Sequence, residues 1–317
     1  MPTATRDTSA EFIERRVEER LHADWASRAL EDRQTRYLVS RGTAHLVRPA
    51  AQAAAQPVAP GAPAVKNEPQ AHIAFLSPAQ FAALGVPETQ QTLLGWFEGR
   101  RCVLVDLPEA ADFQPPGTRY EELRPLLPQV GDAQARLLTY ARALLVWHAR
   151  HRYCGVCGSP TVPRQAGHVQ QCSSASCGAQ VFPRLDPAII VLVTHGDLAL
   201  LGRQPSWPPG RYSTLAGFVE PGESLEEAVA REVHEETGAR VHSVNYFSSQ
   251  SWPFPASLML GFHAQAPVEA IQLDGELEEA RWFERAALRA GQVMLPPPHT
   301  IARQLLEAWF ATGASGH

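Results

Sequence analysis

The segment from Gly217 to Gly238 constrains this chain most, because its residues define both the ends and the faces of one helix. Ser224 and Glu227 have the spacing of a capping box, and Gly238 is a residue type that ends helices, so the segment predicts a helix over 225–237. At ~100° per residue its apolar side chains share one face. These residues are Leu225, Ala228, Val229 and Val233.

Two glutamates, Glu232 and Glu236, project in almost the same direction as the apolar face, and Glu235 lies at its margin. The alternative is a charged helix face exposed to solvent, which would place these glutamates opposite the apolar face. Carboxylates held close together repel one another and have raised pKa values unless a cation lies between them. The all-oxygen ligand set favours Mg²⁺ or Mn²⁺, which typically bridge substrate phosphates and activate water.

A second constraint is a cluster of cysteines. Four of the five cysteines lie within 24 residues, as the pairs Cys154/Cys157 and Cys172/Cys177, whereas Cys102 lies alone in a predicted strand. The spacing predicts a four-thiolate Zn²⁺ site, which has no open coordination position and is therefore structural. Four reduced thiols or two disulfides are the alternatives. A histidine inside this segment, His168, is interpreted as a surface residue.

Composition and charge exclude several classes of protein. The formal net charge is −5, so the chain has no basic field that could follow a long nucleic-acid backbone. No run approaches the ~20 apolar residues needed to span a bilayer, and the charged stretch from Arg6 to Glu19 does not resemble a signal peptide. We expect a cytoplasmic protein without membrane contact.

The 317 residues are enough for two domains with a sizeable core. We expect an N-terminal domain over 1–150 with a flexible Ala/Pro-rich loop at 49–65, a zinc segment over 151–183 and a C-terminal domain over 184–317. The sequence indicates no internal repeat. Apolar patterns predict further elements: strands at 73–76, 92–96 and 102–107, a helix at 132–150, and a hairpin of 188–194 with 198–201.

Three motifs together resemble the NADH pyrophosphatase subfamily of Nudix hydrolases. The segment from Gly217 to Gly238 reproduces the Nudix box, with a departure only at Ala239, and the four cysteines correspond to the subfamily's zinc ribbon. Downstream, residues 249–257 (SQSWPFPAS) resemble the subfamily's SQPWPFPxS array, with Ser251 in place of a proline. The resemblance implies an α/β fold: a Nudix α/β/α sandwich with a mixed sheet, preceded by the zinc ribbon and an α+β N-terminal domain.

The resemblance also implies roles for individual residues. Glu232, Glu235 and Glu236 would bind the catalytic metals with the carbonyl of Ala216 and with Glu276, for which Glu279 is the competing choice. Glu223 and Arg231 would pair to hold the loop against the helix. The implied substrate-binding residues are Arg124, Phe182, Gln250, Ser251, Trp252, Pro253, Phe254, Pro255, Ala256, Ser257 and Ala302. For Arg124 a solvated surface arginine is an equal alternative.

The activity that the resemblance implies is hydrolysis of the diphosphate bond of NADH or NAD⁺, which gives nicotinamide mononucleotide and AMP. Removal of NAD caps from RNA 5′ ends is implied as well, together with a homodimer. A rival from another class is a nucleotide-sensing or nucleic-acid-binding module with little catalysis. Such a module would be expected to lose glutamates of the box, and this chain keeps all of them.

Overall fold

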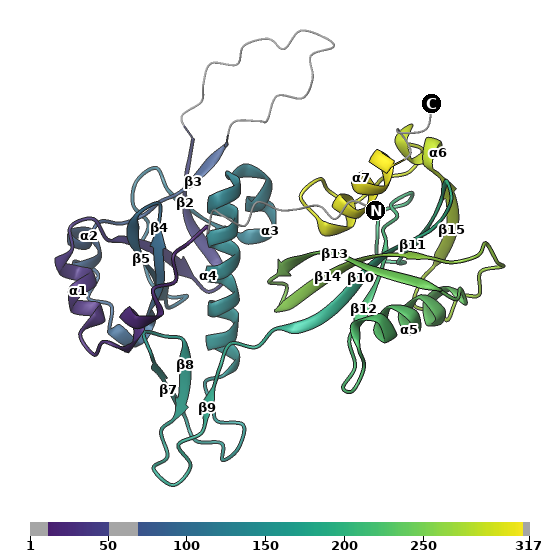
Figure 1. Ribbon diagram of the computed structural model, residues 1–317. Coiled ribbons are helices and arrows are strands. Elements are labelled where there is room, and N and C mark those ends of the chain that lie inside the picture. The colour runs from purple at the N-terminus through teal and green to yellow at the C-terminus, as the bar shows by residue number, and fades with distance from the viewer. Residues whose placement is uncertain (1–11, 51–68, 313–317) are drawn as a thin grey trace, which may run out of the picture. The chain divides into compact units, whose positions relative to one another are not determined.

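The computed structural model describes residues 12–50 and 69–312, so the predicted Ala/Pro-rich loop lies almost entirely outside the described residues. The described chain divides after Arg184 into two compact units (Figure 1). None of the helices within the described ranges is both long and apolar enough to cross a membrane.

The C-terminal unit is built around one mixed sheet with the strand order β13-β14-β10-β11-β15. The central strand β10 pairs in parallel with β14 and antiparallel with β11 and β12, so the predicted hairpin is confirmed. The strands are β10 (Asp186–His195), β11 (Leu198–Arg203), β12 (Leu215–Phe218), β13 (Ser243–Trp252), β14 (Ser257–Gln265) and β15 (Glu279–Glu284).

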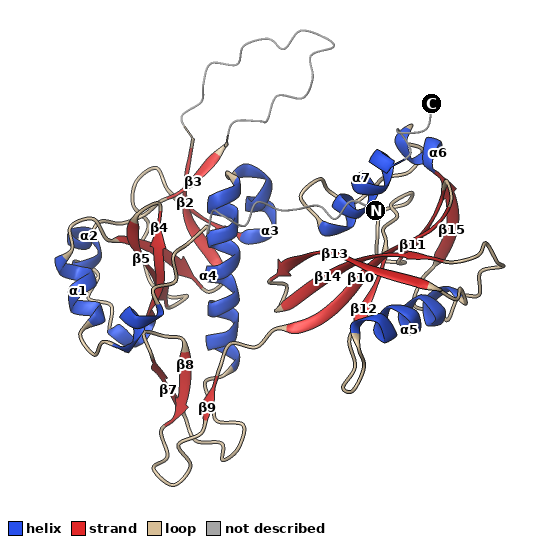
Figure 2. Ribbon diagram, in the orientation of Figure 1, coloured by secondary structure: helices blue, strands red, loops and turns tan. Residues whose placement is uncertain are grey.

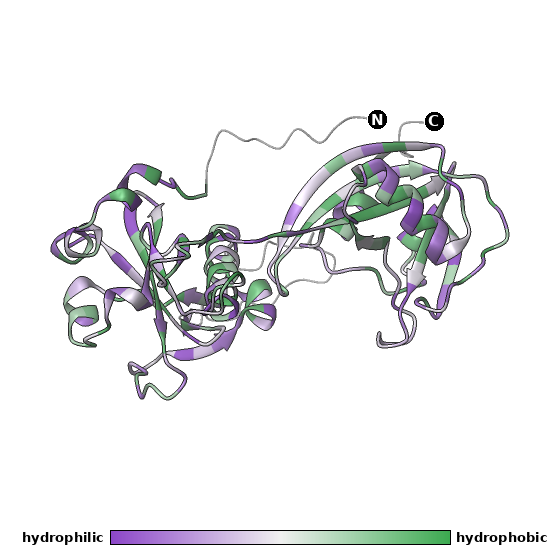
Figure 3. Cartoon of the chain, turned by 90° about the horizontal axis from the view of Figure 1, so that it is seen from below, coloured by the Kyte–Doolittle hydropathy of each residue, from purple (hydrophilic) through white to green (hydrophobic). Residues whose placement is uncertain are grey.

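Helices cover both faces of this sheet, which gives the predicted α/β/α sandwich (Figure 2). Along β10, Ile189, Val191 and Val193 pack in the core beneath α5 (Leu225–Thr237). The alternate residues Ile190 and Leu192 pack against α7 (Ile301–Thr312). This alternation follows from the two-residue period of a strand. In Figure 3 the strands of this unit carry both green, apolar and purple, polar stretches. A short helix, α6 (Arg285–Arg289), follows β15.

The N-terminal unit contains a second six-stranded sheet, with the order β3-β2-β1-β5-β4 and with β6 paired to β2. Its strands are β1 (Arg36–Arg41), β2 (Ala44–Pro49), β3 (Ala71–Ile73), β4 (Gln91–Phe97), β5 (Arg100–Leu107) and β6 (Arg119–Glu122). Its helices are α1 (Trp25–Glu31), α2 (Pro78–Ala82), α3 (Leu123–Leu126) and α4 (Asp132–Arg150), with 3₁₀ turns at Val17–Leu21, Glu88–Gln90 and Leu127–Gln129. The predicted helix over 132–150 is confirmed.

The two sheets share one topology, although the sequence indicates no internal repeat. In each unit the first strand pairs antiparallel with the second and parallel with the later strand of a hairpin: β1 with β2 and β5, and β10 with β11 and β14. The last strands, β6 and β15, pair antiparallel with β2 and β11. The bridge between Tyr37 and Leu76 corresponds to the pairing of β10 with β12, and α2 then corresponds to α5.

The zinc segment follows α4 and forms a small three-stranded sheet, β7-β8-β9. Its strands are β7 (Thr161–Arg164), β8 (Val169–Cys172) and β9 (Gln180–Val181). The prediction of a surface position for His168 is wrong, since the residue is 8% exposed and its Nε2 lies 2.7 Å from the carbonyl oxygen of Leu93. Its partner lies 75 residues away in the sequence, and nothing local in the sequence indicates this contact.

The 249–257 segment contains the end of β13, a tight turn and the first residue of β14. Residues 249–252 continue β13 and pair with β14 up to the contact of Trp252 with Ser257. The chain reverses at 253–256, which contains a cis peptide bond between Phe254 and Pro255. The pairing with β14 therefore orders the polar residues that precede the turn.

Candidate active site and zinc ribbon

Helix α5 begins and ends as the sequence predicts. The Ser224 hydroxyl accepts the backbone N–H of Glu227 at 3.2 Å, and the Glu227 carboxylate accepts that of Ser224 at 2.7 Å. At the other end Gly238 has a φ of 74°, and its N–H donates to the carbonyl of His234 at 2.8 Å. These caps satisfy backbone groups that a helix leaves free, and they fix which residues face the sheet.

Glu236 is the most deeply buried carboxylate of the helix, with only 3% of its surface exposed. Burial, followed by the charges of Glu276, Glu232 and Asp274, raises the pKa of Glu236 to about 8. Its Oε2 atom has no hydrogen-bond partner among the described residues. A buried carboxylate oxygen without a donor, in the electrostatic field of three other carboxylates, has surroundings that a divalent cation would neutralise. Among the described residues, no three acidic side chains have their ligand atoms within 4.8 Å of one another.

Glu232 lies against the backbone of β12. A Cβ atom placed on Gly217 would collide with the Glu232 carboxylate, so only glycine allows this close approach. The pKa of Glu232 is raised, first by burial and further by Glu235 and Glu276, while Arg231 opposes the shift. Ala216 is the next residue on β12 and pairs with Ile190. The Ala216–Gly217 backbone and the Glu232 carboxylate are therefore neighbours.

Arg231 connects the loop before the helix to the helix itself. Its guanidinium donates two hydrogen bonds to the Glu223 carboxylate, at 2.5 and 2.9 Å, and one to the carbonyl of Phe218 at 2.9 Å. These bonds from Arg231 lower the pKa of Glu223 to about 2. The Nη1 atom of the same guanidinium bonds Glu232 at 3.0 Å and Glu235 at 2.9 Å. Arg231 thus braces the loop and also holds two of the predicted metal ligands.

The two candidates for the additional metal ligand have different surroundings. Glu276 is exposed in the loop before β15, and its charge contributes to the raised pKa values of Glu232 and Glu236. Glu279 instead accepts a hydrogen bond from the Tyr212 hydroxyl and pairs with Arg281 at 2.8 Å. The carboxylate of Glu279 is therefore already bound to Tyr212 and Arg281. The charge of Glu276 instead acts on the carboxylates of the acidic helix.

The predicted substrate residues of the C-terminal unit gather around the β13–β14 turn and the start of α7. The Gln250 amide bonds the backbone of this start, donating to His299 and accepting from Ile301, both at 2.8 Å. Trp252 and Phe254 form an edge-to-face pair with ring centres 5.3 Å apart. The side chain of Ala302 is buried in the core under α7. The remaining predicted positions of the segment are Ser251 and Pro255, which are exposed, Ala256, which is half-buried, and Pro253 and Ser257, which are buried.

Two predicted substrate residues belong to the N-terminal unit. Arg124 is exposed on α3, and Phe182, which follows β9, has 58% of its surface exposed. An exposed aromatic side chain is available to a ligand or to another chain. Both assignments stay predictions.

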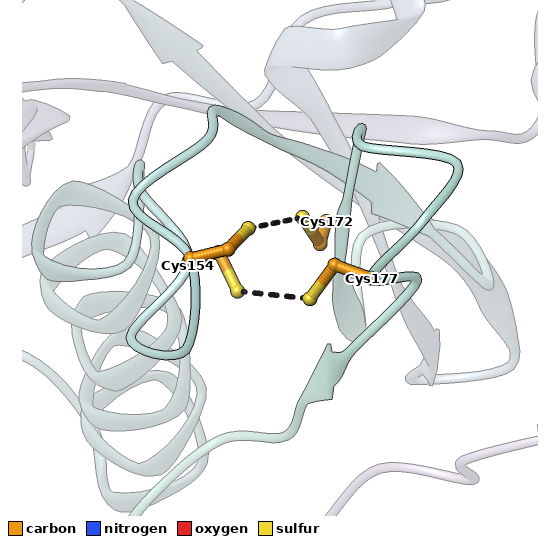
Figure 4. Close-up of side chains that lie close together, drawn as sticks. Cys154, Cys172 and Cys177 are labelled. Atoms are coloured by element: carbon orange, nitrogen blue, oxygen red, sulfur yellow. Dashed lines mark hydrogen bonds between the residues drawn. The ribbon is translucent and has the colours of Figure 1, made fainter.

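The four cysteines of the zinc segment bring their sulfur atoms together (Figure 4). The Sγ atoms of Cys154 and Cys177 are 3.8 Å apart, and those of Cys157 and Cys172 are 3.4 Å apart. A tetrahedral zinc site with Zn–S bonds of ~2.3 Å has sulfur atoms ~3.8 Å from one another. Within the described chain this is the only group of three or more potential ligands with all its atoms within 4.8 Å. The thiols are free of disulfides and fit a structural Zn²⁺.

Comparison with known families gives three consecutive matches. The model of the NUDIX domain matches residues 184–309, that of the NADH pyrophosphatase zinc ribbon domain matches 149–182, and that of the NADH pyrophosphatase-like rudimentary NUDIX domain matches 34–147. Among curated proteins, the chain is 47% identical over 229 residues to the NAD-capped RNA hydrolase NudC of Stutzerimonas stutzeri, which covers 72% of this chain and 80% of that protein. The chain belongs to the NADH pyrophosphatase subfamily of Nudix hydrolases. The protein of the same name from Mycobacterium tuberculosis is 43% identical over 243 residues, covering 71% and 77% of the two chains.

The match of residues 34–147 to a rudimentary Nudix domain agrees with the shared topology of the two sheets. In this Nudix hydrolase, α2 occupies the place of the acidic helix but has five residues and no carboxylate. It retains a capping box, formed by Ser77 and Gln80. The N-terminal unit is thus a Nudix fold without the acidic helix, which the sequence patterns do not reveal.

One residue near the carboxylates has no role in the sequence-based predictions. Asp274 contributes to the raised pKa of Glu236, and its carboxylate accepts the backbone N–H of Glu276 at 2.9 Å. This bond fixes the turn that carries Glu276 toward the acidic helix. The Asp-Gly-Glu order is typical of such a turn and could have indicated it.

Proposed function

We propose that the chain hydrolyses the diphosphate bond of NADH and NAD⁺ to AMP and the reduced or oxidised nicotinamide mononucleotide, respectively, and that it removes NAD caps from RNA 5′ ends. The observation that carries this proposal is the buried Glu236, whose unpartnered oxygen lies amid the charges of Glu232 and Glu276. The relatives' name, NAD-capped RNA hydrolase, supports the same reaction and substrate class.

The proposed metal ligands are Glu232, Glu235, Glu236 and Glu276, together with the carbonyl of Ala216. Bound Mg²⁺ or Mn²⁺ would neutralise charge on the diphosphate and activate water. Arg231 would keep its bonds to Glu223 and Phe218, so the loop would stay in place when Glu232 and Glu235 exchange this arginine for a cation. The proposed role of Glu223 and Arg231 is therefore positioning.

The proposed substrate site includes the turn after β13 and the start of α7. The edge-to-face rings of Trp252 and Phe254 offer an apolar surface for a base, and Gln250 holds the start of α7 next to the turn. Arg124 and Phe182 of the N-terminal unit remain proposed contributors.

Product analysis tests this function directly. Zinc-loaded protein is incubated with Mg²⁺ or Mn²⁺ and NADH, NAD⁺, ADP-ribose, a diadenosine polyphosphate or a short NAD-capped RNA, and the products are separated by chromatography. We expect the mononucleotide halves of NADH and NAD⁺, and 5′-monophosphate RNA from the capped RNA. The relative kcat/KM values rank the substrates and the two cations.

The matched variant is Glu236→Gln, which keeps the shape of the side chain and removes its charge. Because several kcal/mol of transition-state stabilisation depend on the metal, we expect a loss of ~10²-fold or more in kcat. A folded, zinc-loaded Glu236→Gln protein that turns over NADH at the original rate would contradict the assignment. If the original protein cleaves none of the substrates but binds them, the sensing module is the better description.

A homodimer is part of the proposal. Sedimentation at assay concentrations should give a species of twice the 34.7 kDa chain mass. A monomer at concentrations that support full turnover would rule out a dimer requirement without changing the proposed chemistry.

A further inference from the structure

The N-terminal unit contains an open pocket of about 440 Å³. Its described lining includes three arginines and no carboxylate. The lining residues are Arg33, Gln34, Thr35, Arg36, Phe75, Leu76, Ser77 and Arg100.

The pocket occupies a defined place in the shared topology. It lies at the starts of β1 and β5 and at the segment leading into α2. The corresponding places in the C-terminal unit are the starts of β10 and β14 and the segment leading into α5. Those three places border the acidic helix and the 249–257 turn. The pocket thus lies at the place in the N-terminal unit that corresponds to the border of the proposed active site, and its charged side chains are the arginines at the strand starts.

The arginines of the pocket are largely available to a ligand. Arg33 and Arg100 are exposed and form no ion pair with any described residue. Arg36 pairs with Glu98 at 2.9 Å, and its guanidinium lies 5.3 Å from the centre of the Phe75 ring. Unpaired guanidinium groups around one pocket favour a phosphate, which they bind with paired hydrogen bonds.

A buried hydroxyl gives an independent indication of a ligand. Thr35 is 2% exposed, lines the pocket, and its Oγ1 has no hydrogen-bond partner among the described residues. A buried polar group without a partner costs free energy, which a ligand oxygen at this position would recover. The half-buried Phe75 adds an apolar surface on which a base could stack.

We propose that this pocket binds a phosphate group of a nucleotide, either free or within RNA, without cleaving it. The helix α2 carries no carboxylate, so the pocket lacks the metal ligands on which hydrolysis depends. The proposal goes beyond the hydrolase function and does not depend on it. Binding should not require added Mg²⁺ or Mn²⁺.

The experiment measures binding of a fluorescent, uncapped, 5′-monophosphorylated RNA to the zinc-loaded full chain without added Mg²⁺ or Mn²⁺. The test variant is Arg33→Gln/Arg100→Gln, and the control is Arg48→Gln/Arg150→Gln, which removes the same charge from exposed positions of the same unit. We expect the test variant to raise Kd at least about tenfold and to reduce the salt slope by about 1 to 1.5. The control variant should stay within about twofold.

Thr35→Val adds a variant of almost unchanged volume. Because it removes only the unpartnered hydroxyl, we expect weaker binding by about threefold or more with no loss of thermal stability.

Calorimetric titration with AMP separates the two sources of phosphate. AMP binding that is lost in Arg33→Gln/Arg100→Gln identifies a free nucleotide, whereas loss of RNA binding alone identifies the RNA backbone.

Equal binding by the test variant and the original protein would overturn the proposal. Equal weakening by the test and control variants would also overturn it, because general charge would then explain the binding. NADH turnover by the original protein is measured in parallel and tests the proposed function separately. A protein that binds RNA through this pocket but hydrolyses no dinucleotide would contradict the hydrolase function alone.

Discussion

Glu236 and Arg231 lie five positions apart on α5 in opposite electrostatic surroundings. Glu236 is buried near three other carboxyl groups and has an oxygen with no donor. Arg231 bonds three carboxylates at once. The surroundings of Glu236 therefore favour a cation, whereas the carboxylates of Glu223, Glu232 and Glu235 already have the Arg231 guanidinium as their cation. Substitutions of single acidic residues should therefore differ in their effect on activity and on the metal requirement.

Substitutions of Glu276 and Glu279 allow this difference in the metal requirement to be measured. We expect Glu276→Gln to lower kcat/KM for NADH by about tenfold or more and to raise the Mg²⁺ concentration for half-maximal activity, since one metal ligand is lost. We expect Glu279→Gln to leave the metal requirement unchanged, because the Glu279 carboxylate binds Tyr212 and Arg281. Metal titration of both variants provides the check, and a larger shift for Glu279→Gln would reverse the assignment.

At the scale of elements, the ends of α5 determine the direction of its carboxylates. Ser224→Ala removes the side-chain acceptor for the Glu227 N–H, which typically costs about 1 kcal/mol. We expect urea unfolding of the C-terminal unit to shift by this amount. Ser251→Ala, at an exposed position, serves as the control and should change stability by less than about 0.5 kcal/mol. Equal effects of both substitutions would contradict a capping role.

A second prediction concerns His168, which directly precedes β8 and contacts Leu93 of β4. Burial, followed by the nearby Arg20, lowers the pKa of His168 to about 3, so the folded protein keeps this ring neutral. The unfolded chain takes up a proton below about pH 6.5, and stability is lost as the pH falls. His168→Gln can still donate to Leu93 but cannot be protonated.

We therefore expect the original protein to lose more stability than His168→Gln between pH 7.5 and 5.5, by about 1 kcal/mol. Urea unfolding curves at the two pH values measure this difference. Parallel pH dependences for the two proteins would show that His168 has the same pKa in the folded and the unfolded chain, which would contradict the lowered value.

Local patterns in the sequence predict the elements that depend on neighbouring residues. The bounds of α5 follow from its capping residues, and those of α4 follow from the apolar periodicity of its residues. The gathering of the four thiols also follows from short spacings. These features need no knowledge of distant contacts, and the structure confirms them.

Contacts between distant residues account for what the sequence leaves undecided. His168 is buried because Leu93 lies beside it, and Gln250 is engaged because the start of α7 reaches it from 51 residues away. The hydroxyl of Tyr212, 67 residues from Glu279 in the sequence, binds Glu279 and so distinguishes it from Glu276, the other candidate ligand. Neither spacing nor periodicity contains this information.

At the scale of the whole molecule, the zinc ribbon is the part whose stability depends on a bound ion. Cys172→Ser removes one thiolate of the four, and the metal supplies much of the folding free energy of such small segments. We expect the zinc content to fall from one ion per chain to nearly none, with faster hydrogen exchange over residues 149–182. Elemental analysis and exchange mass spectrometry measure these effects. Full zinc content in Cys172→Ser would exclude four-thiolate coordination.

The shared topology of the two sheets has a consequence for how the protein responds to its ionic surroundings. The carboxylates that we propose as ligands of divalent cations are present on α5 and absent from α2. A fall in free Mg²⁺ should therefore slow turnover in one half while the arginine-lined half stays occupied. Two copies of one scaffold, with acidic ligands kept in only one, would let the protein hold a phosphorylated ligand under conditions in which it cannot cut one.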